Sequence, residues 1–520
     1  MSEHTILKPG RNCWHVGAVT KTGLLVDARD YYRAFYHTAR AARRYILISG
    51  WQIDSNVVLL RGEDAKAAGE EAPLISFLNN LCEQNSALRI FILAWDFSMV
   101  YSLDREWFQE WYFNWKTNDR LKFCFDSCDS IDACHHQKFV VIDGKVAFVG
   151  GLDLCSGRWD QRDHRVNNPL RVNPDQSPYK PFHDVQSSHS GPVAQKLAEF
   201  FTERWKCVGG EELDLPAEPS EPAAEPELTI PIAARTAAIS RTLATTSGGR
   251  EPVREIRQLF LDAIAAAEHL IYIENQYFSS AALFKALIER MTDRSRSPLE
   301  IILIIAADAE AISEQLSIGI AQERVMRGLQ EAARENGHSL GIYHPVSVSP
   351  EGEDLPTYIH SKLFLIDDRF LNVGSANMNN RSMGYDTELN VAWEGSASET
   401  ELVESIREVR VNLLAEHTGL DAAARNDLCR VTGLVQYLNG LAETRSGRLR
   451  YHPVRIVPQG YQWITSVLPD GLPFDAEASE DPERIYERLS TKQDSFFTQG
   501  LTSLKNWLAD SGAKSDDRKP

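Results

Sequence analysis

The sequence lacks any apolar run long enough to span a membrane. Its longest such run, residues 301–307, falls far short of the roughly 20 consecutive apolar residues that a membrane helix needs. Residues 1–10 also lack the apolar core of a secretory signal. We therefore expect a cytoplasmic or peripheral membrane protein, with export by a route that reads no N-terminal signal as the alternative.

Cysteine is scarce, with eight residues in a chain of 520. This excludes a small secreted scaffold held by disulfides, and we expect most of the thiols to be reduced. Cys124, Cys128 and Cys134 lie near His135 and His136, but their spacings fit no zinc pattern. We therefore interpret these cysteines as small buried side chains and expect no metal.

Basic residues are outnumbered by acidic ones. The chain has 55 Lys and Arg against 73 Asp and Glu, a formal net charge of −18. This balance argues against a nucleic acid partner, because proteins that bind phosphate backbones rely on clustered cations. The content of 43% hydrophobic and 25% charged residues is typical of a globular protein, and the length suggests two or three domains.

One eight-residue pattern occurs twice. Residues 136–143 read His-Gln-Lys-Phe-Val-Val-Ile-Asp, and residues 360–367 read His-Ser-Lys-Leu-Phe-Leu-Ile-Asp. A single chance HxKxxxxD would appear in roughly one of thirty chains of this length, so one copy alone is weak evidence. The register continues beyond the motif, where Ile142 matches Ile366 and Gly150 matches Gly374. The chain therefore contains an internal duplication.

The two copies lie within similar strand and helix patterns. Each half has a helical pattern, then a strand-like run, then a second buried-strand pattern, at residues 31–44, 45–49 and 88–94 and at residues 254–270, 271–273 and 299–306. This order predicts an α/β fold. Residues 211–235 are rich in Pro and Glu and are expected to form an exposed linker. We predict a first half at 1–210, a second half at 236–424, and a C-terminal extension of unknown role at 425–520 with a helix at 495–508.

The alternation of side chains along a strand distinguishes the motif residues that could take part in the reaction from those that support the fold. Apolar strand-forming residues flank Asp143 and Gly144, a pair that favours a tight hairpin turn. Side chains alternate along a strand, so His136 and Lys138 share one face, whereas Asp143 lies on the opposite face or in the turn. We therefore expect Asp143 to be structural, and likewise His135.

The second copy repeats this arrangement, with His360 and Lys362 on one face and Asp367 in a structural role. Together the copies supply two imidazoles and two ammonium groups, a set that suits a phosphodiester. The lysines would bind the non-bridging oxygens. One imidazole would attack phosphorus while the other protonates the leaving group, because an ordinary histidine pKa near 6.5 allows both states. This chemistry requires no metal or cofactor.

Glycine-containing segments follow both copies. Residues 374–377, Gly-Ser-Ala-Asn, follow the motif at the same distance as residues 150–153, Gly-Gly-Leu-Asp. We assign Gly150 and Gly374 to the structural part of the motif, and Ser375 and Asn377 to phosphate binding. Asp153 cannot donate a hydrogen bond when ionised, so we expect it to contact a backbone group or a lysine instead.

The doubled HxKxxxxD followed by Gly-Gly or Gly-Ser resembles the phospholipase D superfamily. Residues 150–160, 181–185 and 271–278 are similar to the eukaryotic-type branch, and the likeness extends over about residues 10–420. It implies two duplicated α/β/α sandwich halves with mixed sheets, packed around a shared active-site cleft with pseudo-two-fold symmetry.

The resemblance also implies roles for individual residues. His136 would form a phosphohistidine intermediate and His360 would be the general acid. A carboxylate would support each ring, which we match as Asp184 for His136 and Glu388 for His360. The spacing from motif to carboxylate is longer in the first half, so an insertion falls within residues 156–181, where it would form a rim or lid, or a plain surface loop.

The activity that the resemblance implies is hydrolysis of the distal phosphodiester of a phospholipid at a membrane surface. The products would be phosphatidic acid and a free alcohol, and an alcohol could replace water as acceptor. Because the net charge is negative, we expect zwitterionic lipids as substrates, and we expect a monomer. The alternatives are a cardiolipin-synthase-like phosphatidyltransferase and a superfamily nuclease, which the charge disfavours. Both His-Lys pairs are present, so a non-catalytic binding protein is disfavoured as well.

Overall fold

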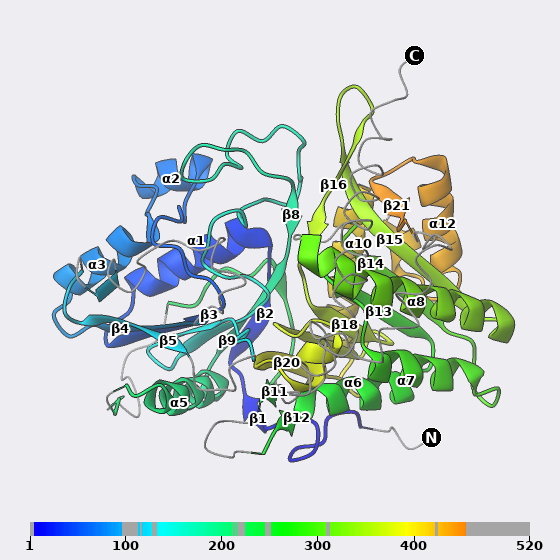
Figure 1. Cartoon of the computed structure of the whole chain (residues 1–520), viewed down its shortest axis with the longest axis horizontal. Coiled ribbons are helices and arrows are strands. Elements are labelled where there is room, and N and C mark those ends of the chain that lie inside the picture. Colours follow the sequence, from blue (N-terminus) through cyan, green and yellow to red (C-terminus); the bar gives the residue numbers. More distant parts are fainter. Residues whose placement is uncertain are drawn as a thin grey trace, which may run out of the picture.

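The computed structural model contains two large mixed sheets, one for each copy of the motif (Figure 1). It describes residues 5–95, 113–114, 117–126, 133–210, 212–213, 215, 224–244, 251–307, 312–421 and 425–453. The predicted helix at 495–508 and most of the C-terminal extension lie outside these ranges. Within them, no helix is both long and apolar enough to cross a membrane.

The first sheet has eight strands, and its middle strands are buried on both faces, as is usual where parallel strands are covered by helices. In spatial order the strands are β10 (Ile230–Pro231), β2 (Lys21–Val26), β9 (Val185–Ser190), β7 (Val146–Gly150), β6 (Phe139–Ile142), β3 (Tyr45–Gly50), β4 (Arg89–Trp95) and β5 (Leu121–Asp126).

The second sheet has eleven strands and repeats the order of the first. Its main path is β1 (His15–Ala18), β11 (Thr236–Leu243), β20 (Glu388–Glu394), β19 (Phe370–Gly374), β18 (Leu363–Ile366), β13 (Leu270–Asn275), β14 (Glu300–Ile305), β15 (Ser339–Val348) and β16 (Asp354–Pro356). Two further strands, β12 (Val253–Arg254) and β21 (Leu449–Tyr451), pair with β11 and β15. The order β2-β9-β7-β6-β3-β4-β5 thus corresponds to β11-β20-β19-β18-β13-β14-β15.

Strand register confirms the duplication. Ile46 of β3 pairs with Ile142 of β6, and Ile271 of β13 pairs with Ile366 of β18. The strand pairs β3–β4 and β13–β14 are parallel, which agrees with the α/β fold expected for each half. The fold is therefore two α/β halves, as the sequence predicted.

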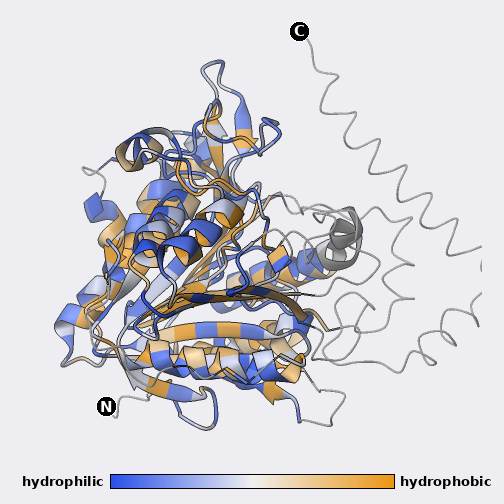
Figure 2. Ribbon diagram, turned by 90° about the vertical axis from the view of Figure 1, so that its left-hand side faces the viewer, coloured by the Kyte–Doolittle hydropathy of each residue, from blue (hydrophilic) through white to orange (hydrophobic). Residues whose placement is uncertain are grey.

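Helices cover the sheets on both sides. Helices α1 (Asp27–Arg40) and α3 (Leu74–Gln84) pack on one face of the first sheet, and α6 (Glu255–Ala266), α7 (Ala281–Thr292) and α8 (Ile312–Asn336) pack on one face of the second. The opposite faces share one core with α5 (Pro192–Cys207), α10 (Thr400–Thr418) and α12 (Leu434–Thr444). The remaining described helices are short: α2 (Gly62–Ala68), α9 (Asn380–Gly384) and α11 (Arg425–Cys429). Figure 2 shows hydrophilic and hydrophobic residues mixed along the helices, as expected for helices that bury one face.

Three strands cross the boundaries that the sequence suggested. Strand β1, from the N-terminal segment, pairs with β11 of the second sheet. Strand β10, from the expected linker, pairs with β2 of the first sheet. Strand β21, from the expected C-terminal extension, pairs with β15. The halves are therefore bound together by backbone hydrogen bonds as well as by side-chain packing.

A small parallel sheet also joins the halves close to the second motif. Strand β8 (Phe182–His183) pairs with β17 (Tyr358–Ile359), and β8 lies between the two halves in Figure 1. This pairing places residue 184 beside residue 360, although they lie far apart in the sequence.

The insertion before β8 is packed rather than superficial. Trp159 belongs to the core beside α1, and Asp160, His164 and Arg171 are buried. These three polar side chains turn inward, whereas residues 174–176 are exposed, so the segment is a surface loop anchored by buried side chains.

The cysteines are mostly free, as expected. Free thiols are found at Cys13, Cys82, Cys124, Cys134, Cys155 and Cys429. Cys207 is an exception, because it is disulfide-bonded.

The motif aspartates have equivalent structural roles. Asp143 accepts hydrogen bonds from the backbone N–H groups of Arg43, Arg44 and Tyr45, at 2.8 to 2.9 Å. Asp367 accepts from three consecutive N–H groups at residues 268–270, at 2.7 to 2.8 Å. Each carboxylate therefore fixes the start of a parallel strand. Asp143 has φ of 53° and Gly144 has φ of 66°, which fits the predicted hairpin turn.

Replacing Asp143 with Ala should lower the unfolding free energy by about 3 kcal/mol, because three backbone donors lose a charged acceptor and each such bond contributes at least about 1 kcal/mol. Chemical denaturation of the purified protein measures this loss. Asp175→Ala is the matched control, because among the described residues the carboxylate of Asp175 accepts bonds from the neighbouring Ser177 alone. A loss below about 1 kcal/mol for Asp143→Ala would contradict the structural role.

Candidate active site

The two motif segments are held by hydrogen bonds from the opposite half. The N–H of His136 donates to the carbonyl of Thr387 at 3.0 Å, and the N–H of His360 donates to the carbonyl of His183 at 2.8 Å. Thr387 directly precedes Glu388, and His183 directly precedes Asp184. Each motif histidine therefore lies beside the segment that carries the other half's carboxylate.

The side chains also pair across the halves, so that each motif histidine contacts the carboxylate of the other half. His136 Nδ1 lies 3.0 Å from both carboxylate oxygens of Glu388, and His360 Nδ1 lies 2.6 Å from Asp184 Oδ2. The expected pairing of Asp184 with His136 and of Glu388 with His360 is wrong. Each carboxylate reaches across the interface because the backbone pairing places it beside the other half's motif. In both pairs Nδ1 is engaged, so Nε2 is the ring nitrogen left for chemistry.

Small neighbours make room for these carboxylates. A Cβ added to Gly151 would lie 2.2 Å from Asp184 Oδ1, a distance that no side chain tolerates. At the corresponding position of the second half, the hydroxyl of Ser375 donates to Glu388 Oε2 at 2.5 Å. Both carboxylates are fully buried, whereas the side chains of His136 and His360 are 16% and 8% exposed. The imidazoles therefore form the accessible part of each pair.

Ser375 does not fit the phosphate-binding role that the sequence suggested. Its hydroxyl donates to Glu388 and accepts from the N–H of Leu389 at 3.0 Å, and the residue is fully buried. Its only hydroxyl proton is already used, so Ser375 holds Glu388 in place. The role of Asn377 stays a prediction: its Oδ1, buried without a hydrogen-bond partner in the described part of the chain, is an acceptor and cannot donate to a phosphate oxygen.

The two motif lysines have different partners. Lys138 Nζ lies 2.7 Å from Asp153 Oδ2, and Asp153 Oδ1 accepts from the N–H of Trp51. This confirms the expected contacts of Asp153 with a lysine and a backbone group. Lys362 Nζ donates instead to the neutral amide of Gln276 at 3.1 Å and to the carbonyl of His360. Sequence reasoning missed Gln276, although it lies within the recognised stretch 271–278.

The motif residues of the two halves affect one another's pKa values, which indicates that they surround one shared space. Burial lowers the pKa of His136 well below its ordinary value, and the charges of Lys138 and Lys362 lower it further. Burial also lowers the pKa of His360 well below its ordinary value, and the charges of Lys362 and Arg158 lower it further. Lysines of both halves thus act on His136. Arg158 comes from the insertion, so that segment contributes a cation to the site.

Burial also shifts the supporting groups toward their neutral forms. It raises the pKa of Glu388 to about 8 and that of Asp184 to about 6. It lowers the pKa of Lys362 to about 7. A site with five shifted groups and several cations is suited to an anionic ligand, because added negative charge would stabilise the charged lysine.

Two buried histidines illustrate what the motif alone does not reveal. His135 is structural as expected, since it bonds to Ser49 at 2.8 Å and to Asp126 at 3.1 Å. His183 instead lies in a buried polar cluster, where its Nε2 is 3.1 Å from Oε2 of Glu274. The signal for this cluster was present in the sequence, because His183 adjoins Asp184 and Glu274 lies within residues 271–278.

Comparison with known families gives two matches. The family described as "Phospholipase D" matches residues 38–316, and the family described as "Cardiolipin synthase, PLD-like domain" matches residues 260–410. The first range extends over more than half of the chain and includes the first motif, and the second includes the second motif.

Individual relatives agree with this result. "Phospholipase D1" of Saccharomyces cerevisiae is 24% identical over 490 residues, which cover 76% of this chain and 29% of that protein. "Phospholipase D alpha 2" of Oryza sativa is 27% identical over 480 residues, which cover 67% of this chain and 58% of that protein. This chain thus spans about a third to a little over half of the length of these relatives.

A solved structure shares the fold. The crystal structure of phosphatidylserine synthase from Haemophilus influenzae superposes with a TM-score of 0.51 and 14% identity, over 83% of this chain and 95% of that one. Such a low identity carries only the fold. The match to the first family is the stronger finding, since it covers more than half of the sequence, and by it this chain belongs to the phospholipase D family.

Proposed function

We propose that the protein is a phospholipase D, which hydrolyses the distal phosphodiester of a glycerophospholipid to phosphatidic acid and a free alcohol. The observation that carries this proposal is the convergence of two carboxylate-held imidazoles and two lysines from opposite halves. Two imidazoles can attack and protonate in one reaction, and two ammonium groups can bind the phosphate oxygens.

In the first step, Nε2 of His136 attacks phosphorus and forms a nitrogen–phosphorus bond. The bond from phosphorus to the head-group oxygen breaks, and that oxygen takes a proton from Nε2 of His360. Lys138 and Lys362 stabilise the charge that develops on the non-bridging oxygens. Glu388 and Asp184 orient the two rings and stabilise a positive charge on them.

In the second step, His360 removes a proton from water, and the oxygen of that water attacks phosphorus. The nitrogen–phosphorus bond breaks, which releases phosphatidic acid and restores neutral His136. An alcohol in place of water would give a new phospholipid by transphosphatidylation. The acceptor that reaches the intermediate therefore decides between hydrolysis and transfer.

The assignment of the two roles rests on the resemblance of the first motif. Burial lowers the pKa of both histidines well below the ordinary value, so the electrostatics of the free site do not distinguish the nucleophile from the acid. Trapping of the phosphorylated histidine decides between this assignment and its reverse.

The net charge of −18 supports zwitterionic lipids as substrates, since an acidic surface is repelled by anionic membranes. We propose a monomer that binds the membrane surface peripherally. A phosphatidyltransferase is the second candidate, supported by the match of residues 260–410 to the family described as "Cardiolipin synthase, PLD-like domain".

Incubation of the purified protein with vesicles tests the proposed reaction. We expect phosphatidic acid from phosphatidylcholine or phosphatidylethanolamine, and phosphatidylglycerol at its expense when glycerol is added, both measured by mass spectrometry. A cardiolipin-synthase-like transferase would instead form cardiolipin from phosphatidylglycerol vesicles. Cleavage of nucleic acid with no lipid product would overturn the proposal.

Replacement of the two histidines tests their roles. His136→Ala should lower turnover at least about a thousandfold for every substrate, because no nucleophile remains. His360→Ala should lose activity on phosphatidylcholine but recover much of it on the p-nitrophenyl ester of phosphatidic acid, whose leaving group needs no proton. His189→Gln is a control outside the site. Phosphate trapped on His360 instead of His136 would reverse the assignment.

The dependence on pH should reflect Lys362. Its pKa is lowered to about 7, so the free protein loses this positive charge as pH rises above that value. With a soluble short-chain phosphatidylcholine, kcat/KM should fall roughly tenfold per pH unit on the alkaline side. Bound phosphate raises the pKa of the lysine, so the alkaline limb of kcat should lie at higher pH. A level kcat/KM up to pH 9 would be inconsistent with this role.

A further inference from the structure

Tyr358 lies beside both functional side chains of the second motif. It belongs to β17, two residues before His360 and four before Lys362. Its hydroxyl accepts a hydrogen bond from Nε2 of Gln276 at 2.7 Å. Oε1 of the same amide accepts from Nζ of Lys362 at 3.1 Å. The tyrosine hydroxyl therefore contacts the amide that holds the lysine.

The amide of Gln276 is fixed at both ends. An ammonium group can only donate, so the end of the amide that faces Lys362 must be the oxygen. At the other end, Nε2 donates to the hydroxyl of Tyr277 at 2.8 Å as well as to that of Tyr358. Both amide hydrogens are thus used, and Gln276 is buried. Hydrogen bonds at the nitrogen also polarise the amide and make its oxygen a stronger acceptor.

The ring of Tyr358 packs against the histidine of the motif. Its centroid lies 6.4 Å from that of His360, with an angle of 26° between the rings. Phe182 lies 5.6 Å from Tyr358 and 5.4 Å from His360. These separations are typical of favourable aromatic contacts. Asp184 holds Nδ1 of the imidazole, and the two neighbouring rings limit its tilt, so the direction of Nε2 is restricted.

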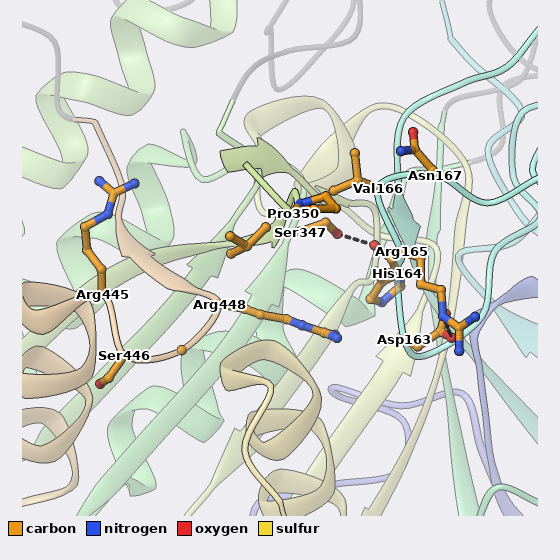
Figure 3. Close-up of a pocket in the computed structure, with 12 residues that line it drawn as sticks. Asp163, His164, Arg165, Val166, Asn167, Ser347, Pro350, Arg445, Ser446 and Arg448 are labelled. Atoms are coloured by element: carbon orange, nitrogen blue, oxygen red, sulfur yellow. Dashed lines mark hydrogen bonds and ion pairs between the residues drawn. The ribbon is translucent and has the colours of Figure 1, made fainter. Parts of the chain in front are cut away.

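The backbone of Tyr358 is fixed by both halves of the chain. Its N–H donates to the carbonyl of Pro181 at 2.8 Å, within the small parallel sheet. The hydroxyl of the preceding residue, Thr357, lies 3.5 Å from that of Ser347. Ser347 in turn donates to the carbonyl of His164 in the insertion, beside a cavity of about 540 Å³ (Figure 3). These contacts place the tyrosine ring and hydroxyl firmly beside the motif.

The first motif is supported differently. The residue two positions before His136 is Cys134, which has no ring. Strand register matches Gln276 with Trp51, whose ring centroid lies 5.8 Å from Nζ of Lys138. That lysine also bonds to a carboxylate, as described above. The second lysine keeps its positive charge for a ligand, because its hydrogen-bond partners, an amide and a backbone carbonyl, are neutral.

We propose that Tyr358 is a positioning residue for the reaction, whose hydroxyl fixes Lys362 through Gln276 and whose ring supports His360. The inference rests on the proposed function, because it concerns the tasks assigned there to the lysine and the histidine. Tyr358 acts through these neighbours and not on the reacting atoms. One side chain thereby places both the cation that binds the phosphate and the imidazole that protonates the leaving group.

The groups that set the charge of Lys362 come from both halves. Its pKa is lowered to about 7, chiefly by burial. Lys138 and Arg158 also lower it, whereas Asp184 and Glu388 raise it. The amide oxygen that accepts from the ammonium group favours the charged form. Loss of this acceptor should therefore lower the pKa further, and a carboxylate in its place should raise it.

Substitutions that change single atoms test the role of the hydroxyl. With a soluble short-chain phosphatidylcholine, Tyr358→Phe should shift the alkaline limb of kcat/KM to lower pH by roughly half a unit. Gln276→Ala should shift it in the same direction, and the isosteric Gln276→Glu should shift it to higher pH. Tyr343→Phe is the matched control, because Tyr343 is a buried tyrosine whose hydroxyl donates to Asn439. It should leave the profile unchanged.

Two further variants separate the hydroxyl from the ring. Tyr358→Phe combined with Gln276→Ala should shift the limb no further than Gln276→Ala alone, because the hydroxyl acts through the amide. Tyr358→Leu removes the ring as well, and it should lower turnover on phosphatidylcholine at least about tenfold more than Tyr358→Phe. This extra loss should be smaller on the p-nitrophenyl ester of phosphatidic acid, whose leaving group needs no proton.

A titration without substrate separates this inference from the proposed function. Carbon-13 NMR of the full chain with labelled lysine gives the pKa of Lys362, whose signal is assigned with Lys362→Arg. We expect a lower pKa in Tyr358→Phe, a higher one in Gln276→Glu and no change in Tyr343→Phe. A chain that is inactive on lipids but shows these shifts would contradict the proposed function alone. An unchanged pKa in Tyr358→Phe, or additive shifts in the double variant, would overturn the positioning role.

Discussion

The site depends on one exchange, in which each motif histidine bonds to a carboxylate of the other half. Glu388 and Asp184 are fully buried, so neither has water as a substitute partner. Removing one member of a buried charged pair costs several kcal/mol, because the remaining group stays desolvated and unpaired. Neither half alone can therefore supply partners for these buried groups. The chemistry depends on the strands and the small sheet that bind the halves together.

The exchange is symmetric, but its surroundings are not. Lys138 faces the carboxylate of Asp153, whereas Lys362 faces the neutral amide of Gln276. Gly151 leaves space for Asp184, whereas Ser375 donates to Glu388. Equivalent positions thus give different electrostatic environments on the same backbone frame. Two copies of one motif can perform different steps of a reaction because such local differences change the proton affinity of each group.

The sequence predicted much of the frame, because local rules govern it. Strand alternation and turn chemistry predicted that Asp143 and Asp367 are structural, and the repeat predicted two α/β halves. The partners of His136 and His360 could not be predicted in this way. Distance along the chain does not say whether Asp184 folds back onto its own half or reaches across an interface. Strand β1 escaped prediction for the same reason, since it pairs with the distant strand β11.

The exchanged carboxylates also bear on how such a chain could arise. In a two-fold symmetric dimer, a residue i that contacts j of the partner is matched by j contacting i. His136 with Glu388, and His360 with Asp184, obey this rule when residues are matched through the repeat. This is the arrangement expected of a single-copy protein that is complete only as a dimer and whose two copies were later fused. Fusion makes assembly independent of protein concentration. It also lets each copy accept substitutions that a symmetric dimer would have to bear twice.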